Sequence, residues 1–219
     1  YNGSGVVISD NHIYGSHDTA IQFYGGSGIV RGNRIHDNVY MGINAPGGVE
    51  IVDNDIWGNS IGINGGGAIH GNRIYRNTSG IESSGQNIYD NDIYANTTGI
   101  AVSRATISGN RVYDNSVGIR GTSNNRIINN VVYNNTNVGI QIESTQTSSG
   151  SGMYNNTIYQ NVGRALWLTS SANGVKLSSN IIWIEAGYGI VVDSNSQTGF
   201  VSDYNLLYKG PAENAYAGL

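Results

Sequence analysis

A unit of about 20 residues recurs along the chain, and this repeat constrains the fold more than any other feature. Each unit has an aliphatic residue, two variable positions, an asparagine, one variable position, then usually Ile or Val and an aromatic residue. The leading asparagines are Asn11, Asn33, Asn54, Asn72, Asn91, Asn110, Asn130, Asn156, Asn180 and Asn205. Their successive spacings of 22, 21, 18, 19, 19, 20, 26, 24 and 25 residues are typical of a solenoid.

Three columns of aliphatic residues accompany the asparagines. The first column, three residues before each asparagine, is Ile8, Val30, Ile51, Ile69, Ile88, Ile107, Ile127, Met153 and Leu177. The second, two residues after it, is Ile13, Ile35, Ile56, Ile74, Ile93, Val112, Val132, Ile158, Ile182 and Leu207. The third, usually following a glycine, is Ile21, Ile43, Ile63, Ile81, Ile100, Ile119, Ile140, Leu166 and Ile190.

Three short strands per unit, each with an inward aliphatic residue, describe a triangular coil. Stacked coils lie about 4.8 Å apart, so like residues pack on like and form columns. We therefore predict an all-β fold, a right-handed single-stranded parallel β-helix of about ten rungs. A leucine-rich solenoid would carry Leu at its regular positions, and Leu is scarce here.

The asparagines suit the bends between strands. Asparagine tolerates left-handed backbone and hydrogen-bonds nearby backbone groups, and stacked amides also bond to the coils above and below. The preceding residue is often a bend former as well, as at Gly32, Asp53, Gly71, Asp90, Gly109, Asn129 and Asn155. A second column follows five residues later, at Asn38, Asn59, Asn77, Asn96, Asn115, Asn135 and Asn161. Both columns are predicted to lie at bends and to form Asn ladders.

The composition fits one domain with its own core. The chain has 219 residues, of which 38% are hydrophobic and 12% charged, with 32 Gly and 2 Pro. Recurrent Ile and Val argue against a Gly-rich disordered chain. The 11 basic and 15 acidic residues give a net charge of −4, which argues against a nucleic-acid groove and against electrostatic docking on membranes. Cysteine is absent, and no apolar run reaches the ~18 residues of a membrane span.

Runs such as Gly71-Asn72-Arg73-Ile74-Tyr75-Arg76-Asn77 resemble the repeats of the parallel β-helix family of secreted bacterial proteins, which includes pectate lyases and mannuronan C5-epimerases. The resemblance covers nearly the whole chain and is specific for fold rather than for activity. The run Asp203-Tyr204-Asn205-Leu206-Leu207-Tyr208 resembles the last rung of such proteins, which usually continue past it. The resemblance thus implies one β-helix domain over residues 1–219, as a module or fragment of a longer extracellular or cell-surface protein.

Two outward columns flank the second aliphatic column. Arg34, Asp55, Arg73, Asp92 and Arg111 follow the leading asparagines and alternate in sign, which predicts a surface ion-pair ladder rather than a charged rail for a sugar acid. The second outward column is aromatic: Tyr14, His36, Trp57, Tyr75, Tyr94, Tyr113, Tyr133, Tyr159, Trp183 and Tyr208. We expect these rings to stack on one another, although such a column also suits a polysaccharide.

A third outward column follows the Gly-Ile column: Gln22, Asn44, Asn64, Glu82, Ala101, Arg120, Gln141 and Trp167. The resemblance implies that a polysaccharide cleft runs along this strand. The connections lengthen late, at Ser144–Gly150, so a groove is expected to be best walled near Arg120, Gln141 and Trp167. The predicted substrate-binding residues are Glu82, Arg120, Gln141 and Trp167. A polar strand face without function is the competing interpretation.

The catalytic motifs of polygalacturonases, pectate lyases and mannuronan epimerases are not found. The nearest approach to the epimerase motif is Tyr14-Gly15-Ser16-His17-Asp18, which lacks its proline and has a changed spacing. His12, His17, His36 and His70 show no metal-ligand spacing in the sequence, so no metal site is predicted. Asp53-Asn54-Asp55 and Asp90-Asn91-Asp92 offer oxygen ligands for Ca²⁺, but turn chemistry explains them and no cofactor is predicted.

These observations favour an extracellular β-helix module that contacts polysaccharide. One alternative is a structural or adhesive rod, such as a surface protein, tail fibre or spacer. A second alternative is a uronan lyase or C5-epimerase. We also expect end-to-end self-association through rungs without a dedicated cap.

Overall fold

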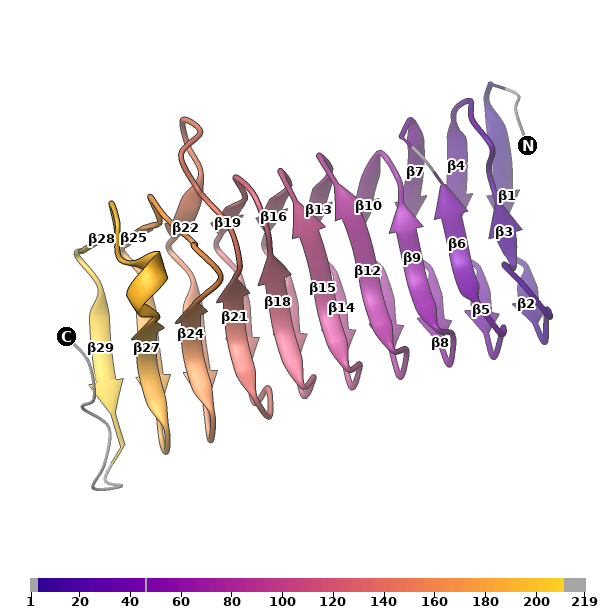
Figure 1. Ribbon diagram of the computed structural model, residues 1–219. Coiled ribbons are helices and arrows are strands. Elements are labelled where there is room, and N and C mark those ends of the chain that lie inside the picture. Colours follow the sequence, from indigo (N-terminus) through magenta and orange to yellow (C-terminus); the bar gives the residue numbers. More distant parts are fainter. Residues whose placement is uncertain (1–3, 46, 211–219) are drawn as a thin grey trace.

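The computed structural model describes residues 4–45 and 47–210. The chain coils around one axis, and its stacked strands form three parallel sheets along that axis (Figure 1). The predicted domain limits at residues 1 and 219 lie outside these ranges. The chain visits the sheets in turn, so strands three apart in sequence are hydrogen-bonded neighbours over most of the helix. This order is that of a single-stranded parallel β-helix and confirms the predicted fold class.

The strands are short and their bounds follow the repeat. Sheet A is formed by β1 (Val6–Ser9), β4 (Gly28–Arg31), β7 (Val49–Val52), β10 (Ala68–His70), β13 (Asn87–Tyr89), β16 (Thr106–Ser108), β19 (Arg126–Ile128), β22 (Gly152–Tyr154), β25 (Lys176–Ser178) and β28 (Val201–Asp203). Sheet B is formed by β2 (His12–Tyr14), β5 (Arg34–His36), β8 (Asp55–Trp57), β11 (Arg73–Tyr75), β14 (Asp92–Tyr94), β17 (Arg111–Tyr113), β20 (Val131–Tyr133), β23 (Thr157–Gln160), β26 (Ile181–Ile184) and β29 (Leu206–Lys209). Sheet C is formed by β3 (Ile21–Gln22), β6 (Met41–Ala45), β9 (Ile61–Gly65), β12 (Ser79–Ser84), β15 (Thr98–Ser103), β18 (Val117–Gly121), β21 (Val138–Ile142), β24 (Arg164–Leu168) and β27 (Tyr188–Val192).

The three aliphatic columns form the core. Ile74 pairs in register with Ile56 on one side and Ile93 on the other, and all three side chains are fully buried. The other two columns are buried in the same way through the middle of the stack. Burial weakens in the end coils, where Ile13 and Ile190 are only partly buried and Leu207 is 53% exposed. The predicted core is therefore confirmed in all but the terminal coils.

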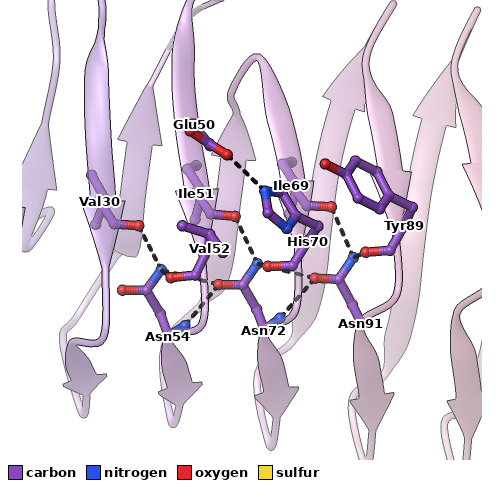
Figure 2. A network of polar contacts seen from close by, with 10 residues as sticks. All are labelled: Val30, Glu50, Ile51, Val52, Asn54, Ile69, His70, Asn72, Tyr89 and Asn91. Atoms are coloured by element: carbon purple, nitrogen blue, oxygen red, sulfur yellow. Dashed lines mark hydrogen bonds and ion pairs between the residues drawn. The ribbon is translucent and has the colours of Figure 1, made fainter. Parts of the chain in front are cut away.

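The leading asparagines lie beside the bends, but the left-handed residue is the one before them. Gly32, Asp53 and Asp90 have φ of +65°, +55° and +54°. None of the leading asparagines in the described residues has a positive φ, so the left-handed conformation of the bend belongs to the preceding residue. Their side chains turn inward instead. Asn54 and Asn72, for example, are 2% and 1% exposed and form a hydrogen-bonded ladder (Figure 2).

The second ladder is shorter than predicted. It runs from Asn38 to Asn135 through buried amides that bond to the next coil. The assignment of Asn161 to this ladder is wrong, because β23 extends through Gln160 and turns Gln160 inward while Asn161 is exposed. A Cβ built on Gly139 would lie 2.6 Å from Nε2 of Gln160. In the preceding coil, the side chain of Asn135 lies beside Gly118 in the same way. Glutamine thus replaces asparagine at this level of the stack.

The late coils carry the longest connection. The segment between β21 and β22 extends beyond the neighbouring coils (Figure 1), yet its Gln146 is 2% exposed. Oε1 of Gln146 accepts a hydrogen bond of 2.7 Å from the Asn125 backbone N–H, and Oδ1 of Asn125 accepts one of 3.1 Å from Ala105. A short third ladder therefore anchors this loop to the core.

Helical structure is minimal. The helical element within residues 4–45 and 47–210 is the 3-10 turn η1 (Ser194–Ser196). In that part of the chain no helix has the length and apolarity needed to span a membrane.

Candidate functional site

The outer face of sheet C carries the predicted column in register. Each of its members from Gln22 to Trp167 pairs with the next one through adjacent parallel strands. Outward orientation follows from the alternation of side chains along a strand, because the preceding isoleucine points into the core. Glycine before that isoleucine allows close stacking, since a Cβ on Gly62 would lie 2.6 Å from the Gly80 carbonyl oxygen. Glu82, Arg120, Gln141 and Trp167 therefore share one face, as predicted.

An open depression of about 680 Å³ lies over the second to sixth members of this column. Asn44, Asn64, Glu82, Ala101 and Arg120 contribute to its lining, together with residues at the ends of the same strands. The depression thus includes Glu82 and Arg120, whereas Gln141 and Trp167 lie outside its lining. The hollow therefore reaches only the first of the three rungs that were expected to be best walled, that of Arg120.

Surface amides form a short ladder at the N-terminal end of the face. Nδ2 of Asn44 donates to Oε1 of Gln22 at 2.9 Å, and Nδ2 of Asn64 donates to Oδ1 of Asn44 at 3.1 Å. An amide has two N–H donors and an oxygen with two lone pairs, so one ladder bond uses only part of its capacity. These amides can therefore hydrogen-bond a ligand rich in hydroxyl groups without breaking the ladder.

Glu143 organises the middle of the face and was not identified from the sequence. Its Oε2 lies 2.9 Å from Nε of Arg120, and its Oε1 accepts a hydrogen bond of 2.7 Å from Nε2 of Gln141. The Arg120 side chain is 50% exposed, whereas Glu143 is 18% exposed. The positive charge of Arg120 is consequently balanced within the protein, which makes the face less attractive to a polyanion.

Trp167 is held in place by two charged residues that were also missed. Its Nε1–H donates to Oδ1 of Asp193 at 3.0 Å, and the guanidinium carbon of Arg164 lies 4.5 Å from the indole ring centroid. Hydrogen bonds from Thr169 and Trp167, followed by the charge of Arg164, lower the pKa of Asp193. Asp193 therefore remains ionised at neutral pH and fixes the indole. Asp193 lies two residues after the residue that pairs with Trp167 in the next coil. The two-residue period of a strand could therefore have revealed it from the sequence.

Sheet B presents the aromatic column on its outer face. The rings stack continuously from Tyr14 to Tyr133, with centroid separations of 4.1 to 5.6 Å and interplanar angles of 3° to 11°. The later rings change geometry, and Tyr159 meets Trp183 edge-on at 6.0 Å and 75°. Ring-on-ring stacking is therefore confirmed for the first seven members of the column.

The charged column lies on the same face and forms separate ion pairs. Arg73 and Asp55 are 3.6 Å apart, and Arg111 and Asp92 are 2.6 Å apart. Arg73 also donates to the hydroxyl of Tyr94 at 3.2 Å. The predicted alternation of charges in register is confirmed. The ion pairs join neighbouring coils two at a time.

Candidate metal-ligating residues are mostly dispersed. In the described part of the chain no cluster of three or more His, Cys, Asp or Glu side chains is positioned to hold a metal ion. The amides of Asn54 and Asn91, between the acidic pairs, are committed to the inner ladder. His17 and Asp18 lie exposed at the bend before β3. The spacing of histidines in the sequence did not reveal one contact, because His12 and His36 meet across adjacent coils.

The chain was compared with protein-family models and with curated proteins. A family model for the right handed beta helix region matches residues 1–119 and, again, residues 61–204. No curated protein matches the chain at a significant level.

Several solved structures share the fold at low identity. The Dettilon tailspike protein (gp208) superposes with a TM-score of 0.66 and 16% identity over 95% of this chain and 54% of its own. A double mutant of the periplasmic alginate epimerase AlgG superposes with a TM-score of 0.62 and 21% identity over 94% of this chain and 51% of its own. AlgG without those substitutions gives a TM-score of 0.54 and 22% identity, over 84% of this chain and 47% of its own. The chain therefore spans about half the length of these proteins, and the likeness concerns the fold.

Proposed function

The chain belongs to the right-handed β-helix family, and from that premise we propose that it is an extracellular β-helix module that binds polysaccharide along the outer face of sheet C. The observation that carries this proposal is the in-register column of hydrogen-bonding side chains beside an open depression. A polymer of repeating sugars can contact such a row over several coils at once. A compact ligand would use only one coil of such a row.

The electrostatics of the face favour a neutral or sparsely charged glycan. Arg120 is paired with Glu143, Arg164 lies over Trp167 beside Asp193, and Glu82 adds a negative charge to the depression. The net charge of the chain is −4. A long polyanion would therefore be repelled, whereas hydroxyl groups can bond to Asn44 and Asn64 without an electrostatic cost.

The solved relatives give this proposal its context. One is named as a tailspike and the other as a periplasmic alginate epimerase, which supports a location outside the cytoplasm. The second name also refers to a polysaccharide, alginate. At identities of 16% and 21% their activities do not transfer to this chain. We therefore propose binding and an extracellular or surface location, and leave lyase or epimerase chemistry aside.

A structural rod is the second candidate, and the ladders favour it. Two inner amide ladders, the aromatic stack and the ion pairs all strengthen contacts between coils without involving a ligand. A rod needs nothing more than this rigidity. The two functions differ in one observable property, because a rod does not bind glycan through sheet C.

A glycan array probed with the 219-residue chain separates the two functions. We expect binding to one class of neutral or sparsely charged polysaccharide, and expect it to be lost in the double variant Glu82→Ala/Arg120→Ala. The matched control is Arg73→Ala/Asp55→Ala, which removes an exposed pair from sheet B and should retain binding. An array without any ligand, or equal losses in both double variants, would favour the rod.

A further inference from the structure

Two histidines from different coils converge near the N-terminal end of sheet B. Nε2 of His12 and Nε2 of His36 lie 2.6 Å apart, although the residues are 24 positions apart in the chain. His12 starts β2 and His36 ends β5, and the register pairs His12 with Arg34 and Tyr14 with His36. The two imidazoles therefore meet diagonally between adjacent strands, with their Nε2 atoms facing one another.

The second nitrogen of His36 is also occupied. Nδ1 of His36 lies 2.8 Å from Oδ2 of Asp37, so Nδ1–H can donate to this carboxylate and leave the Nε2 lone pair free of that proton. A histidine that ligates a metal commonly donates its other N–H to a carboxylate, which fixes its tautomer and orientation. Asp37 has φ of +52° and belongs to the bend that follows β5. The bend thus places the Asp37 side chain directly beside the His36 ring.

Stacking fixes the plane of the His36 ring. Its centroid lies 4.1 Å from that of Trp57 at 9°, and 5.3 Å from that of Tyr14 at 5°. The His36 side chain is accordingly only 15% exposed, whereas His12 is exposed and lies tilted against Tyr14 and His36 rather than stacked on them. One rigid and one adjustable imidazole allow the pair to adapt to a bound ion.

We propose that His12 and His36 form a binding site for a borderline divalent transition-metal ion of the Zn²⁺ type, with water completing its coordination. Imidazole nitrogen is a ligand that suits Zn²⁺, Cu²⁺ and Ni²⁺. With metal–nitrogen bonds of about 2.0–2.1 Å, two tetrahedral ligands lie about 3.3 Å apart, so a small rotation of His12 accommodates the ion. For both imidazoles to bind through Nε2 as neutral ligands, His36 keeps its proton on Nδ1 beside Asp37 and His12 takes the tautomer protonated on Nδ1, so the proton between the two Nε2 atoms moves to Nδ1 of His12 through solvent.

The site is independent of the proposed polysaccharide face, because it lies on sheet B rather than on sheet C. A metal held by His12 and His36 links β2 to β5 and so joins two consecutive coils. β2 has one neighbour in the described sheet, β5, and is joined to it by backbone hydrogen bonds. The metal–nitrogen bonds would add a further link between these two strands. Metal binding should therefore stabilise the N-terminal coils against local unfolding.

Calorimetric titration of the untagged 219-residue chain with ZnCl2 tests the site. We expect a single ion per chain, with the affinity weakened by about 10-fold or more in His12→Asn and in His36→Asn. Asp37→Asn should weaken it by about 10- to 100-fold through loss of the orienting carboxylate. His17→Asn, which removes an exposed histidine nearby in sequence, is the control and should bind as the unmodified chain does. Because His12 is exposed and outside the Trp57 stack, its variant should fold normally, as circular dichroism can check.

Fluorescence gives a second readout that reports position. The chain has 3 tryptophans, and the His36 ring stacks on Trp57. In the background Trp167→Phe/Trp183→Phe, Cu²⁺ should quench the remaining Trp57 emission, and His12→Asn should shift the quenching to higher Cu²⁺ concentration. The proposal is overturned if millimolar Zn²⁺ gives no binding heat, or if binding and quenching persist unchanged in both histidine variants.

Discussion

The side-chain nitrogen of Asn72 lies 3.0 Å from the amide oxygen of Asn91 in the next coil, and the backbone N–H of Asn72 donates to the same oxygen at 3.0 Å (Figure 2). Nδ2 of Asn72 also donates to the carbonyl of His70 in its own coil and to that of Ile51 in the preceding one. One amide therefore joins three successive coils. The repetition of this arrangement explains why asparagine recurs at this position.

Replacing Asn91 with alanine should be strongly destabilising. The change removes the acceptor for Asn72 and the two backbone bonds that Nδ2 of Asn91 makes, and so leaves buried polar groups without partners. Each such group costs about 1–3 kcal/mol, so we expect a loss of at least 2 kcal/mol in urea unfolding. Asn161→Ala is the matched control, because Asn161 fits the sequence pattern but is exposed. It should change stability by less than about 0.5 kcal/mol.

Replacing Ile93 with alanine should cost about 2–5 kcal/mol, because a cavity in the middle of a stack cannot collapse. Ile93 is fully buried between Ile74 and Val112. Arg73→Ala should cost less than about 1 kcal/mol, since the Arg73 side chain is 57% exposed and lies 3.6 Å from Asp55. Urea melts of the two variants check this difference. Equal losses would mean that the inward and outward faces have been exchanged.

Gln160→Leu should stabilise the protein by about 1 kcal/mol. Gln160 is fully buried, and neither polar atom of its amide has a hydrogen-bond partner among the described residues. Removing an unsatisfied buried amide while retaining similar volume recovers its desolvation cost. Asn135→Leu, one coil earlier, is the contrasting variant and should destabilise, because the amide of Asn135 bonds to Asn115, Tyr133 and Val112. Thermal unfolding of both variants should therefore shift in opposite directions.

The stacked tyrosines should titrate late. Burial is the main cause that raises the pKa of Tyr75, Tyr113 and Tyr133 above the ordinary value of 10.0. Because folding favours their neutral form, the stability that they contribute is fully present below about pH 10 and is lost as pH rises through the raised folded pKa. Absorbance at alkaline pH should show these phenols ionising after those of the urea-unfolded chain. Coincident titration curves would contradict the buried stack.

The sequence predicted the inner architecture well because each column repeats one physical requirement. Ile51, Ile74 and Ile81 recur in three phases of the same period, and a parallel coil is the arrangement that buries all three. The interruptions were not predictable in this way. Asn161 keeps its spacing from Ile158, yet one additional strand residue places Gln160 in the interior.

The candidate site was predicted less completely than the core. The outward column on sheet C followed from alternation, so Glu82 and Trp167 were placed correctly on one face. Glu143 and Asp193 were missed because each lies just after the end of its strand, β21 or β27, where the outward column was not followed. The convergence of His12 and His36 is also diagonal, which a search for conventional ligand spacing does not detect.

The most direct test of the central claim, that sheet C rather than sheet B binds a glycan, is the affinity of the Trp167→Ala and Trp57→Ala variants for the best ligand of the array. Trp167 presents its indole on sheet C, and Trp57 is enclosed in the stack on sheet B. By analogy with other aromatic stacking platforms, Trp167→Ala should lose about 1–3 kcal/mol of binding free energy, whereas Trp57→Ala should bind unchanged. Unchanged binding in Trp167→Ala, or a greater loss in Trp57→Ala, would contradict the assignment of the glycan to sheet C.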